Sequence, residues 1–297
     1  MNSSEIINKF ALFYGAHLPY HPGKWRVIEF LIRTFRLQDF YEGKSFDVKR
    51  LNLLWQLWPD CLVQRSVYYL SCYEVNETNW LRDRVKPDWV FFDVGSNFGY
   101  YSMLVSQLSH KQAQVYAFEP LARNYNLLNH NKALNGFERL KTFKLALSNA
   151  TGETDFLLPQ LSNMGHGRID VRDESERGGA DSEKVRTTTL DTFVGELGTD
   201  KIDFIKVDIE GAEVLFLEGA AQTLRDLRPM LMIEFNPTSL EELGTSADVL
   251  LRMLKELNYK TYRVRSNRLE AFDDVRAIED YCNLICVPEE ARDASTQ

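Results

Sequence analysis

The chain has 297 residues, of which 44% are hydrophobic and 26% are charged, as is typical of a globular protein with a substantial core. Its formal net charge of −8 argues against a nucleic-acid partner, because a phosphate backbone binds a basic surface. No apolar run approaches the ~20 residues that span a bilayer, so we expect no transmembrane segment. Four cysteines without zinc-like spacing predict reduced thiols and a cytoplasmic protein.

Residues 1–86 differ in composition from the rest of the chain. They hold four of the five tryptophans and show no alternation of strands with helices. Within them, residues 26–37 form an amphipathic, arginine-containing stretch. Such a stretch could lie on a membrane surface, although a helix that faces the core is the more common case.

Apolar, strand-like runs alternate with helical segments from residue 87 onward, which indicates an α/β fold with a mainly parallel sheet. The expected strands of this alternation are residues 89–95, 114–120, 140–147, 201–209 and 228–237. The expected helices are residues 100–110, 121–136, 210–224 and 246–258. Between about residues 148 and 200 the rhythm breaks, with a further strand near 154–159 and a polar loop after it.

The last two expected strands, residues 260–266 and 281–288, follow one another without a helix. We expect them to form an antiparallel hairpin at the edge of the sheet. The prediction is therefore a seven-stranded, mostly parallel, Rossmann-like domain over residues 87–290. The polar tail, residues 291–297, is expected to be flexible.

The segment DVGSNFG, residues 93–99, connects the first strand of this domain to its first helix. A glycine turn in that place lets the backbone approach a ligand closely, and ligands bind beyond the carboxyl ends of parallel strands. Asn97 stands where a dinucleotide fingerprint would need its second glycine, which counts against NAD. Glu119 ends the second strand, where a carboxylate can accept both hydroxyls of a ribose. The pattern therefore indicates a nucleoside.

These segments resemble the FkbM family of S-adenosylmethionine-dependent methyltransferases. The resemblance covers roughly residues 70 to 240 and is carried by DVGSNFGYYS (93–102), YAFEP (116–120), LALSN (145–149), TTTLDTF (187–193), FIKVDIEGAE (204–213), LEGA (217–220) and RPMLMIEF (228–235). It implies S-adenosylmethionine as the cofactor, bound by a seven-stranded methyltransferase domain. It also implies that residues 1–86 form an N-terminal cap on the substrate side.

The resemblance further implies a set of cofactor-binding residues at or just after the ends of the expected strands. These are Asp93, Gly95, Ser96, Asn97, Gly99, Glu119, Pro120, Ala146 and Asp208. Asp93 and the two glycines would line the methionine end. Glu119 would hold the ribose hydroxyls, and Ala146 would lie near the adenine.

Methyl transfer is an in-line displacement that depends mainly on positioning, and a hydroxyl acceptor gains from a general base or a metal ion. The candidate catalytic residues are Asp208, Glu234 and His166. Asp208 follows the fourth strand and could act as the base, or bind Mg2+ together with Glu234 at the end of the fifth. The competing interpretation of Asp208 is a helix cap. His166 lies in the polar loop, where a solvent-exposed histidine is the alternative to a general base.

Four functions are compatible with these residues. The leading hypothesis is O-methylation of a hydroxyl on a sugar, polyketide or other secondary metabolite, and N-methylation of an amide or peptide is its variant. A nicotinamide-dependent oxidoreductase and a non-catalytic nucleoside-binding module are the others. The acceptor would be a small molecule, a glycan or a peptide. A homo-oligomer is compatible with the sequence.

Overall fold

The computed structural model describes residues 3–21, 23–158, 168–169, 182–275 and 281–290. At its centre lies an eight-stranded sheet with the order β13-β12-β14-β11-β10-β3-β4-β5. Its five parallel strands are β3 (Val90–Val94), β4 (Gln114–Phe118), β5 (Leu140–Phe143), β10 (Phe204–Val207) and β11 (Met230–Phe235). The order reverses between β3 and β10, so the sheet is doubly wound, and ligands bind at such a switch point.

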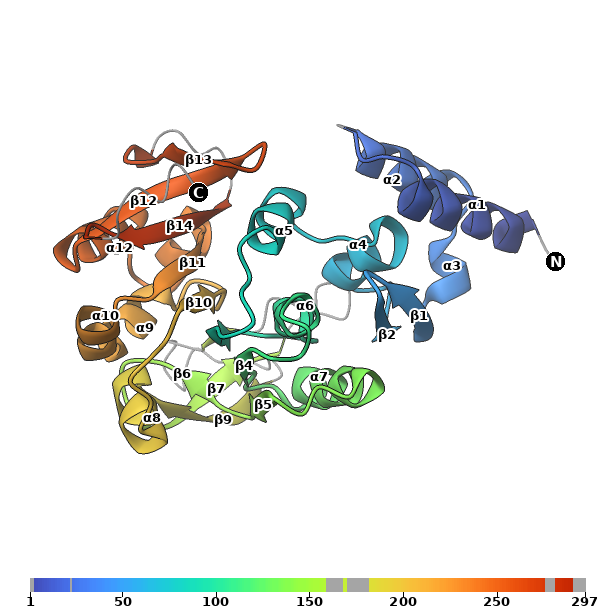
Figure 1. Cartoon of the computed structure of the whole chain (residues 1–297). Helices are drawn as coiled ribbons and strands as arrows, with labels where there is room; N and C mark the ends of the chain where they lie inside the picture. Colours follow the sequence, from blue (N-terminus) through green and yellow to red (C-terminus); the bar gives the residue numbers. More distant parts are fainter. Residues whose placement is uncertain (1–2, 22, 159–167, 170–181, 276–280, 291–297) are drawn as a thin grey trace.

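Helices cover both faces of the sheet, as expected for parallel strands that read as continuous apolar runs (Figure 1). The helices after β3 are α6 (Tyr100–Leu108), α7 (Ala122–Asn135), α8 (Leu190–Leu197), α9 (Glu213–Gly219), α10 (Ala221–Leu227), α11 (Pro237–Glu242) and α12 (Ala247–Glu256). Successive strand residues point to opposite faces, so Phe91 packs in a cluster with α6 and α7 while Phe92 packs in a second cluster with α8 and α12. The helix predicted at 210–224 is divided into α9 and α10 at Ala220.

The antiparallel end of the sheet corrects two expectations. Strand β14 (Cys282–Pro288) pairs antiparallel with both β11 and β12 (Tyr259–Arg265), and β12 pairs with β13 (Arg268–Ala271). The predicted count of seven strands is therefore wrong, because β13 adds an eighth. The two predicted terminal strands do pair antiparallel, but β14 lies inside the sheet and the edge hairpin is β12–β13. The reason is burial: β14 is buried along almost its whole length, whereas β13 is mostly exposed.

A second sheet of four short strands lies beside the first. It contains β6 (Ala146–Leu147), β9 (Ser182–Thr188), β7 (Gly152–Leu157) and β8 (Arg168–Ile169), in that order. The strand predicted at 140–147 is thus two strands, because β5 stays in the main sheet while β6 pairs with β9. The further strand expected near 154–159 corresponds to β7.

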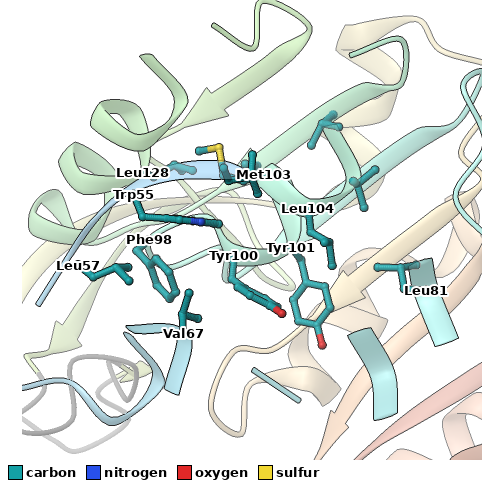
Figure 2. Packing of buried hydrophobic residues seen from close by; sticks show 14 of the residues in the cluster. Trp55, Leu57, Val67, Leu81, Phe98, Tyr100, Tyr101, Met103, Leu104 and Leu128 are labelled. Atoms are coloured by element: carbon teal, nitrogen blue, oxygen red, sulfur yellow. The ribbon is translucent and has the colours of Figure 1, made fainter. Parts of the chain in front are cut away.

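The residues before the main sheet form α1 (Ser3–His17), α2 (Lys24–Thr34), α3 (Gln38–Tyr41), β1 (Phe46–Arg50), β2 (Leu53–Leu57), α4 (Leu62–Leu70) and α5 (Val75–Arg82). They share one core with the sheet (Figure 2). The buried Trp55 ring lies 5.7 Å from Phe98 and 6.3 Å from Tyr100, centroid to centroid. Asn131 of α7 also accepts a hydrogen bond from the Gln56 amide at 2.8 Å.

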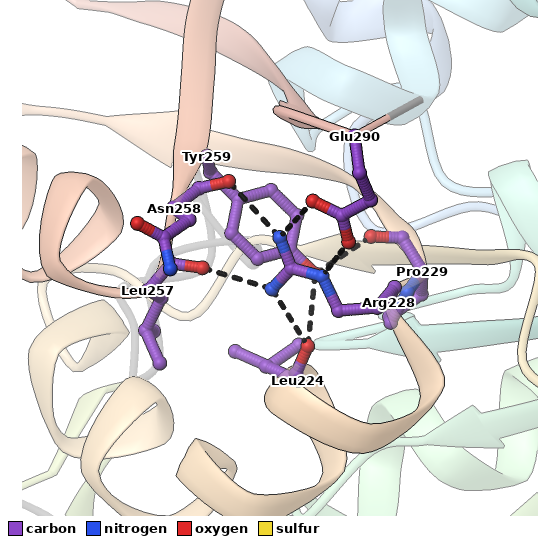
Figure 3. A network of polar contacts seen from close by, with 7 residues as sticks. All are labelled: Leu224, Arg228, Pro229, Leu257, Asn258, Tyr259 and Glu290. Carbon is purple, nitrogen blue, oxygen red and sulfur yellow. Dashed lines mark hydrogen bonds and ion pairs between the residues drawn. The ribbon is translucent and has the colours of Figure 1, made fainter. Parts of the chain in front are cut away.

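The start of β11 is fixed by Arg228, whose backbone is left-handed at φ 51°. Its guanidinium donates hydrogen bonds to the carbonyls of Leu224, Leu257 and Asn258 and pairs with Glu290 (Figure 3). The ring of Tyr259 lies 4.7 Å below the guanidinium. This network joins α10, β12 and the end of β14 on the side of the sheet where β11 begins. Among the described residues, no helix is both long and apolar enough to cross a membrane.

Candidate active site

The carboxyl ends of β3, β4, β10 and β11 meet around Gly95, where three adjoining hollows open. The first is a pocket of about 210 Å³ bordered by Asp93, Lys206, Asp208 and Glu234. The second, about 30 Å³, is bordered by Asn97, Glu119, Pro120 and Phe156, and the third, about 20 Å³, by Ala146, Phe156 and Ala212. All three border Gly95. They therefore lie next to one another along the strand ends.

The glycine loop packs tightly against other segments of the chain. Gly95 and Gly99 have φ values of 80° and 94°, and Asn97 between them is also left-handed at 51°. A Cβ atom added to Gly95 would lie 1.8 Å from the carbonyl oxygen of Asp208, and one on Gly99 would lie 2.5 Å from Leu128 Cδ1. The need for glycine at these positions therefore arises first from packing against the rest of the chain.

Asp93 anchors the helix that follows this loop. Its Oδ2 accepts hydrogen bonds from both the backbone amide, at 2.9 Å, and the hydroxyl of Ser102 in α6. Burial raises the pKa of Asp93 to about 6, although the Ser102 bonds and the nearby Lys206 ammonium act in the opposite direction. The carboxyl group borders the 210 Å³ pocket from below.

Glu119 lies at the end of β4 with both carboxylate oxygens engaged. Oε2 accepts from the Asn97 amide and Oε1 from the Leu121 amide, each at 2.9 Å. Burial raises its pKa to about 7, while these two bonds lower it. The Asn124 side chain makes a third hydrogen bond to this carboxyl group, so a lone pair remains for a ligand hydroxyl. Beside it, the buried Asn97 Oδ1 finds no hydrogen-bond partner among the described residues.

Three carboxyl groups gather on the other side of the loop. Oxygen atoms of Asp208, Glu210 and Glu234 all lie within 4.8 Å of one another. Asp208 directly follows β10, and Glu210 is a residue with left-handed backbone at φ 55°. Glu234 belongs to β11. The structure thus brings Asp208 and Glu234 together and adds Glu210.

The side chain of Lys206 lies beneath this cluster, almost completely buried inside β10. Its Nζ lies 3.0 Å from Asp208 Oδ2 and 3.1 Å from Asn283 Oδ1, and 5.4 Å from the centre of the Tyr101 ring. Burial lowers the pKa of Lys206, but Asp208 and Glu74 outweigh that effect, so the net pKa is raised and the ammonium keeps its charge. Lys206 is therefore paired with an acid.

Glu234 has one oxygen without a hydrogen-bond partner in the part of the chain that the structure describes. This atom, Oε2, is buried. Burial, then Asp208 and Glu210, raise the pKa of Glu234 well above its usual value, and Lys206 only partly opposes this. Burial thus favours the protonated form of Glu234, and a cation in the cluster would favour the ionised form.

A further acid connects this cluster to the N-terminal region. Glu74 accepts a short hydrogen bond from the Tyr101 hydroxyl and a 2.7 Å bond from Asn283 Nδ2. Because Asn283 in turn accepts from Lys206, a chain of contacts runs from Glu74 to Asp208. Sequence reasoning missed Tyr101, Asn283 and the pocket-lining Phe156. The signal that could have indicated buried polar partners is Lys206, a lysine inside an apolar strand.

The predicted site residues fall into four groups. The residues at the 210 Å³ pocket are Asp93, Gly95, Ser96, Asn97, Asp208 and Glu234. Glu119, Pro120 and Ala146 border the smaller hollows. Gly99 borders none of the three and instead precedes the first residue of α6. His166 lies outside the described residues.

The sequence profile of the Methyltransferase FkbM domain matches residues 93–261. This chain belongs to the FkbM methyltransferase family. The predicted family and the predicted enzyme class, a methyltransferase, are therefore confirmed, and the match includes the glycine loop, Glu119, Asp208 and Glu234.

Several characterised proteins are similar to this FkbM domain. The AMB antimetabolite synthetase AmbE of Pseudomonas aeruginosa is 28% identical over 217 residues, which is 63% of this chain but 10% of AmbE. The 2-O-methyltransferase NoeI of Sinorhizobium fredii is 28% identical over 53% of this chain and 67% of NoeI. The hexuronic acid methyltransferase AglP of Haloferax volcanii is 24% identical over 65% and 72%. A solved structure, the methyltransferase FkbM of Methylobacillus flagellatus, aligns with 95% of this chain and 58% of its own at 13% identity and a TM-score of 0.43.

Proposed function

We propose that this protein transfers the methyl group of S-adenosylmethionine to a hydroxyl group of a sugar or another small acceptor. Family membership supports the reaction class. The name of one relative, a 2-O-methyltransferase, supports transfer to oxygen, and the name of another, a hexuronic acid methyltransferase, supports a sugar acceptor. The observation that carries the proposal is the set of three hollows around Gly95, with Glu119 on one side and the carboxyl groups of Asp208, Glu210 and Glu234 on the other.

Each hollow would hold a different part of the cofactor. Glu119 would accept hydrogen bonds from the ribose hydroxyls, and the orphaned Asn97 Oδ1 beside it offers another acceptor. Ala146 and Phe156 would border the adenine. Because the two smaller hollows measure only about 30 and 20 Å³, cofactor binding would require residues of their lining, such as Phe156, to shift. The methionine end would lie near Asp93 and the glycine loop.

The chemistry on the protein side would be general-base catalysis. The cofactor supplies an electrophilic methyl group when bound. Asp208 borders the larger pocket and would take the proton from the acceptor hydroxyl. Lys206 fixes the orientation of the Asp208 carboxylate at 3.0 Å. Glu234, when protonated, would donate a hydrogen bond to the same acceptor.

The donor set also fits a hard cation. Asp208, Glu210 and Glu234 each offer carboxylate oxygens, the ligands that Mg2+ prefers. A cation held there would ionise Glu234 and lower the pKa of the acceptor hydroxyl. Full activity after exhaustive chelation would exclude this part of the proposal and leave Asp208 as a base alone.

We further propose that residues 1–86 form a cap over the acceptor side of the site, with the methyltransferase domain at residues 87–290. Leu62 and Val63 at the start of α4, together with Tyr73, border the same pocket as Asp208. The acceptor would therefore lie between the cap and the strand ends.

The test has two steps and uses the full chain. Calorimetric titration with S-adenosylhomocysteine should show binding, whereas titration with NADH should show none. Incubation with methyl-labelled S-adenosylmethionine and panels of glycans, small hydroxylated molecules and peptides should then label an oxygen. Label on nitrogen would establish the N-methylation variant instead. Binding of NADH alone would favour the oxidoreductase, and binding of S-adenosylhomocysteine without transfer to any acceptor would favour the non-catalytic module.

A further inference from the structure

Exposed apolar side chains are concentrated at one end of the molecule, far from the strand ends. Among the described residues, eight of the thirteen exposed large hydrophobic side chains belong to α1, α2 and the segments joined to them. These eight are Ile6, Phe10, Phe13, Leu18, Tyr20, Val27, Phe30 and Phe35. Phe30 is 63% exposed and Phe13 is 58% exposed. A monomeric protein rarely gathers so many large apolar groups in one place unless they bind something.

On α1 these side chains form one face of the helix. Ile6, Phe10 and Phe13 recur at spacings of four and three residues, so they lie on the same side. The opposite side carries Ala11 and Gly15, which are buried against the protein. Gly15 lies so close to α4 that an added Cβ would be 2.1 Å from the Tyr69 carbonyl oxygen. The core contacts of α1 are therefore already made, and its aromatic face points outward.

Helix α2 has the same two-sided construction. Ile28 and Ile32 are buried in the core cluster, while Val27 and Phe30 on the other side are exposed. The sequence prediction of a helix that faces the core thus accounts for only one side of this helix. Helices α1 and α2 lie side by side at the margin of the molecule, away from the sheet (Figure 1). Since each turns its core side toward the protein, their exposed sides share one outer surface.

The charge of this surface is opposite to that of the whole protein. Residues 3–36 contain five basic and two acidic side chains, although the chain carries a net charge of −8. Four of the five basic residues are exposed, and they lie among the exposed apolar groups: Lys9, Arg26, Arg33 and Arg36. Phe30 stands between Arg26 and Arg33, at helical spacings of four and three residues. Basic side chains around an aromatic face are complementary to the anionic headgroups and apolar interior of a bilayer.

We propose that the hairpin of α1 and α2 binds the surface of an anionic lipid bilayer. Phe10, Phe13 and Phe30 would enter the boundary between headgroups and acyl chains, and Arg26 and Arg33 would contact the headgroups. A second copy of the chain fits this surface less well. A symmetric dimer would bring the basic groups of both copies together in a desolvated interface. The proposal concerns a partner and does not depend on which acceptor is methylated.

Co-sedimentation of the full chain with vesicles tests this proposal. Vesicles of phosphatidylcholine with about 30% phosphatidylserine should bind the protein about tenfold more tightly than phosphatidylcholine alone. Binding should weaken as the salt concentration rises from about 0.1 M to about 0.5 M. The triple variant Phe10→Ser, Phe13→Ser, Phe30→Ser should lose binding by at least about tenfold.

The matched control is Leu54→Ser with Leu134→Ser, because these residues are exposed by 46% and 36% but lie outside the hairpin. The control should bind vesicles like the natural chain, and both variants should keep the natural circular dichroism spectrum. The proposal fails if no vesicle binds the natural chain, or if the triple variant binds as well as the control. A different outcome is that sedimentation equilibrium shows a dimer of the natural chain and a monomer of the triple variant, with no binding to vesicles. That outcome would overturn the proposal and assign the surface to a second copy of the chain.

Discussion

Acidic side chains have different surroundings at the two ends of the parallel strands. Where the strands begin, the acids are paired: Lys201 Nζ lies 3.0 Å from Asp88 and 3.3 Å from Asp203, and Asp203 also accepts from the Val90 amide. Where the strands end, Glu119 and Glu234 are buried with raised pKa values. The ion pairs where the strands begin stabilise the fold. Glu119 and Glu234, where the strands end, are available to interact with a ligand.

Size of a hollow does not distinguish the two ends. A hollow of about 470 Å³ lies where the strands begin, bordered by Asp88, Trp89 and Arg139. It exceeds the 210 Å³ pocket at the other end. Yet the charged groups around it already have partners, such as Lys201 on Asp88 and the Gln112 carbonyl on Arg139. The chemistry of the lining, and not its volume, therefore marks the candidate active site.

The largest effect should come from Gly95→Val. The added side chain would overlap the Asp208 carbonyl and require a backbone that L-residues rarely adopt, so we expect a loss of stability of at least about 3 kcal/mol. Gly152→Val is the control, because an added Cβ there meets nothing within 4 Å. Urea unfolding of both variants measures the difference. Equal unfolding midpoints would show that the loop does not depend on this close packing.

Asp208→Asn and Asp203→Asn compare the two ends of a single strand. Asp208→Asn should lower kcat by about 10²–10⁴-fold if the carboxylate is the base, with nearly unchanged affinity for S-adenosylhomocysteine. Asp203→Asn should leave kcat unchanged and cost about 1 kcal/mol, since it weakens contacts with Lys201 and the Val90 amide. Kinetics with titration calorimetry separates these outcomes. An Asp208→Asn enzyme with natural kcat would reduce Asp208 to a loop-capping role.

The smallest effect should appear as a dependence on pH. Burial raises the pKa of Glu119 to about 7, so the folded state holds a proton that the unfolded state releases near pH 4.5. The free energy of unfolding should therefore fall as pH rises from about 4.5 through about 7, and Glu119→Gln should remove that part of the slope. Asp88 should act with the opposite sign, because its hydrogen bond and charge pairing with Lys201 lower its pKa. Its contribution is lost as the solution becomes more acidic.

Cofactor affinity offers a second readout of the same residue. Ionised Glu119 is the better acceptor for ribose hydroxyls, so binding of S-adenosylhomocysteine should tighten several-fold between about pH 6 and pH 8. Glu119→Gln should weaken binding and flatten this dependence. A natural chain whose affinity does not change over this range would exclude the ribose role.

The sequence was sufficient for those parts of the fold that repeat a simple pattern. Buried parallel strands read as continuous apolar runs, so β3, β4, β10 and β11 were predictable, and with them the positions of Glu119, Asp208 and Glu234. Strand β13 was missed because its exposed residues carry no apolar pattern. The hairpin of β1 and β2 was missed because its turn places Leu51 and Asn52 at positive φ, where asparagine followed by glycine is the usual signal.

The contacts of the site were less predictable than its location. The path from Glu74 through Asn283 to Lys206 joins the N-terminal region, β14 and β10. Nothing in a local pattern connects residues so far apart in the chain. Glu210 and Glu213 show a related limit, since both follow Asp208 but only Glu210 lies in the carboxyl cluster. Glu213 instead accepts from the amides of Ile209 and Gly211.

The contact between Gly95 and the Asp208 carbonyl has an evolutionary consequence. It presses the loop after β3 against the loop after β10, although more than a hundred residues separate them in the chain. A side chain at position 95 could be accepted only if the second loop had already shifted, and such a shift would move Asp208 as well. We expect related sequences to keep both loops at a constant length or to change them together. The two segments would therefore evolve as one unit.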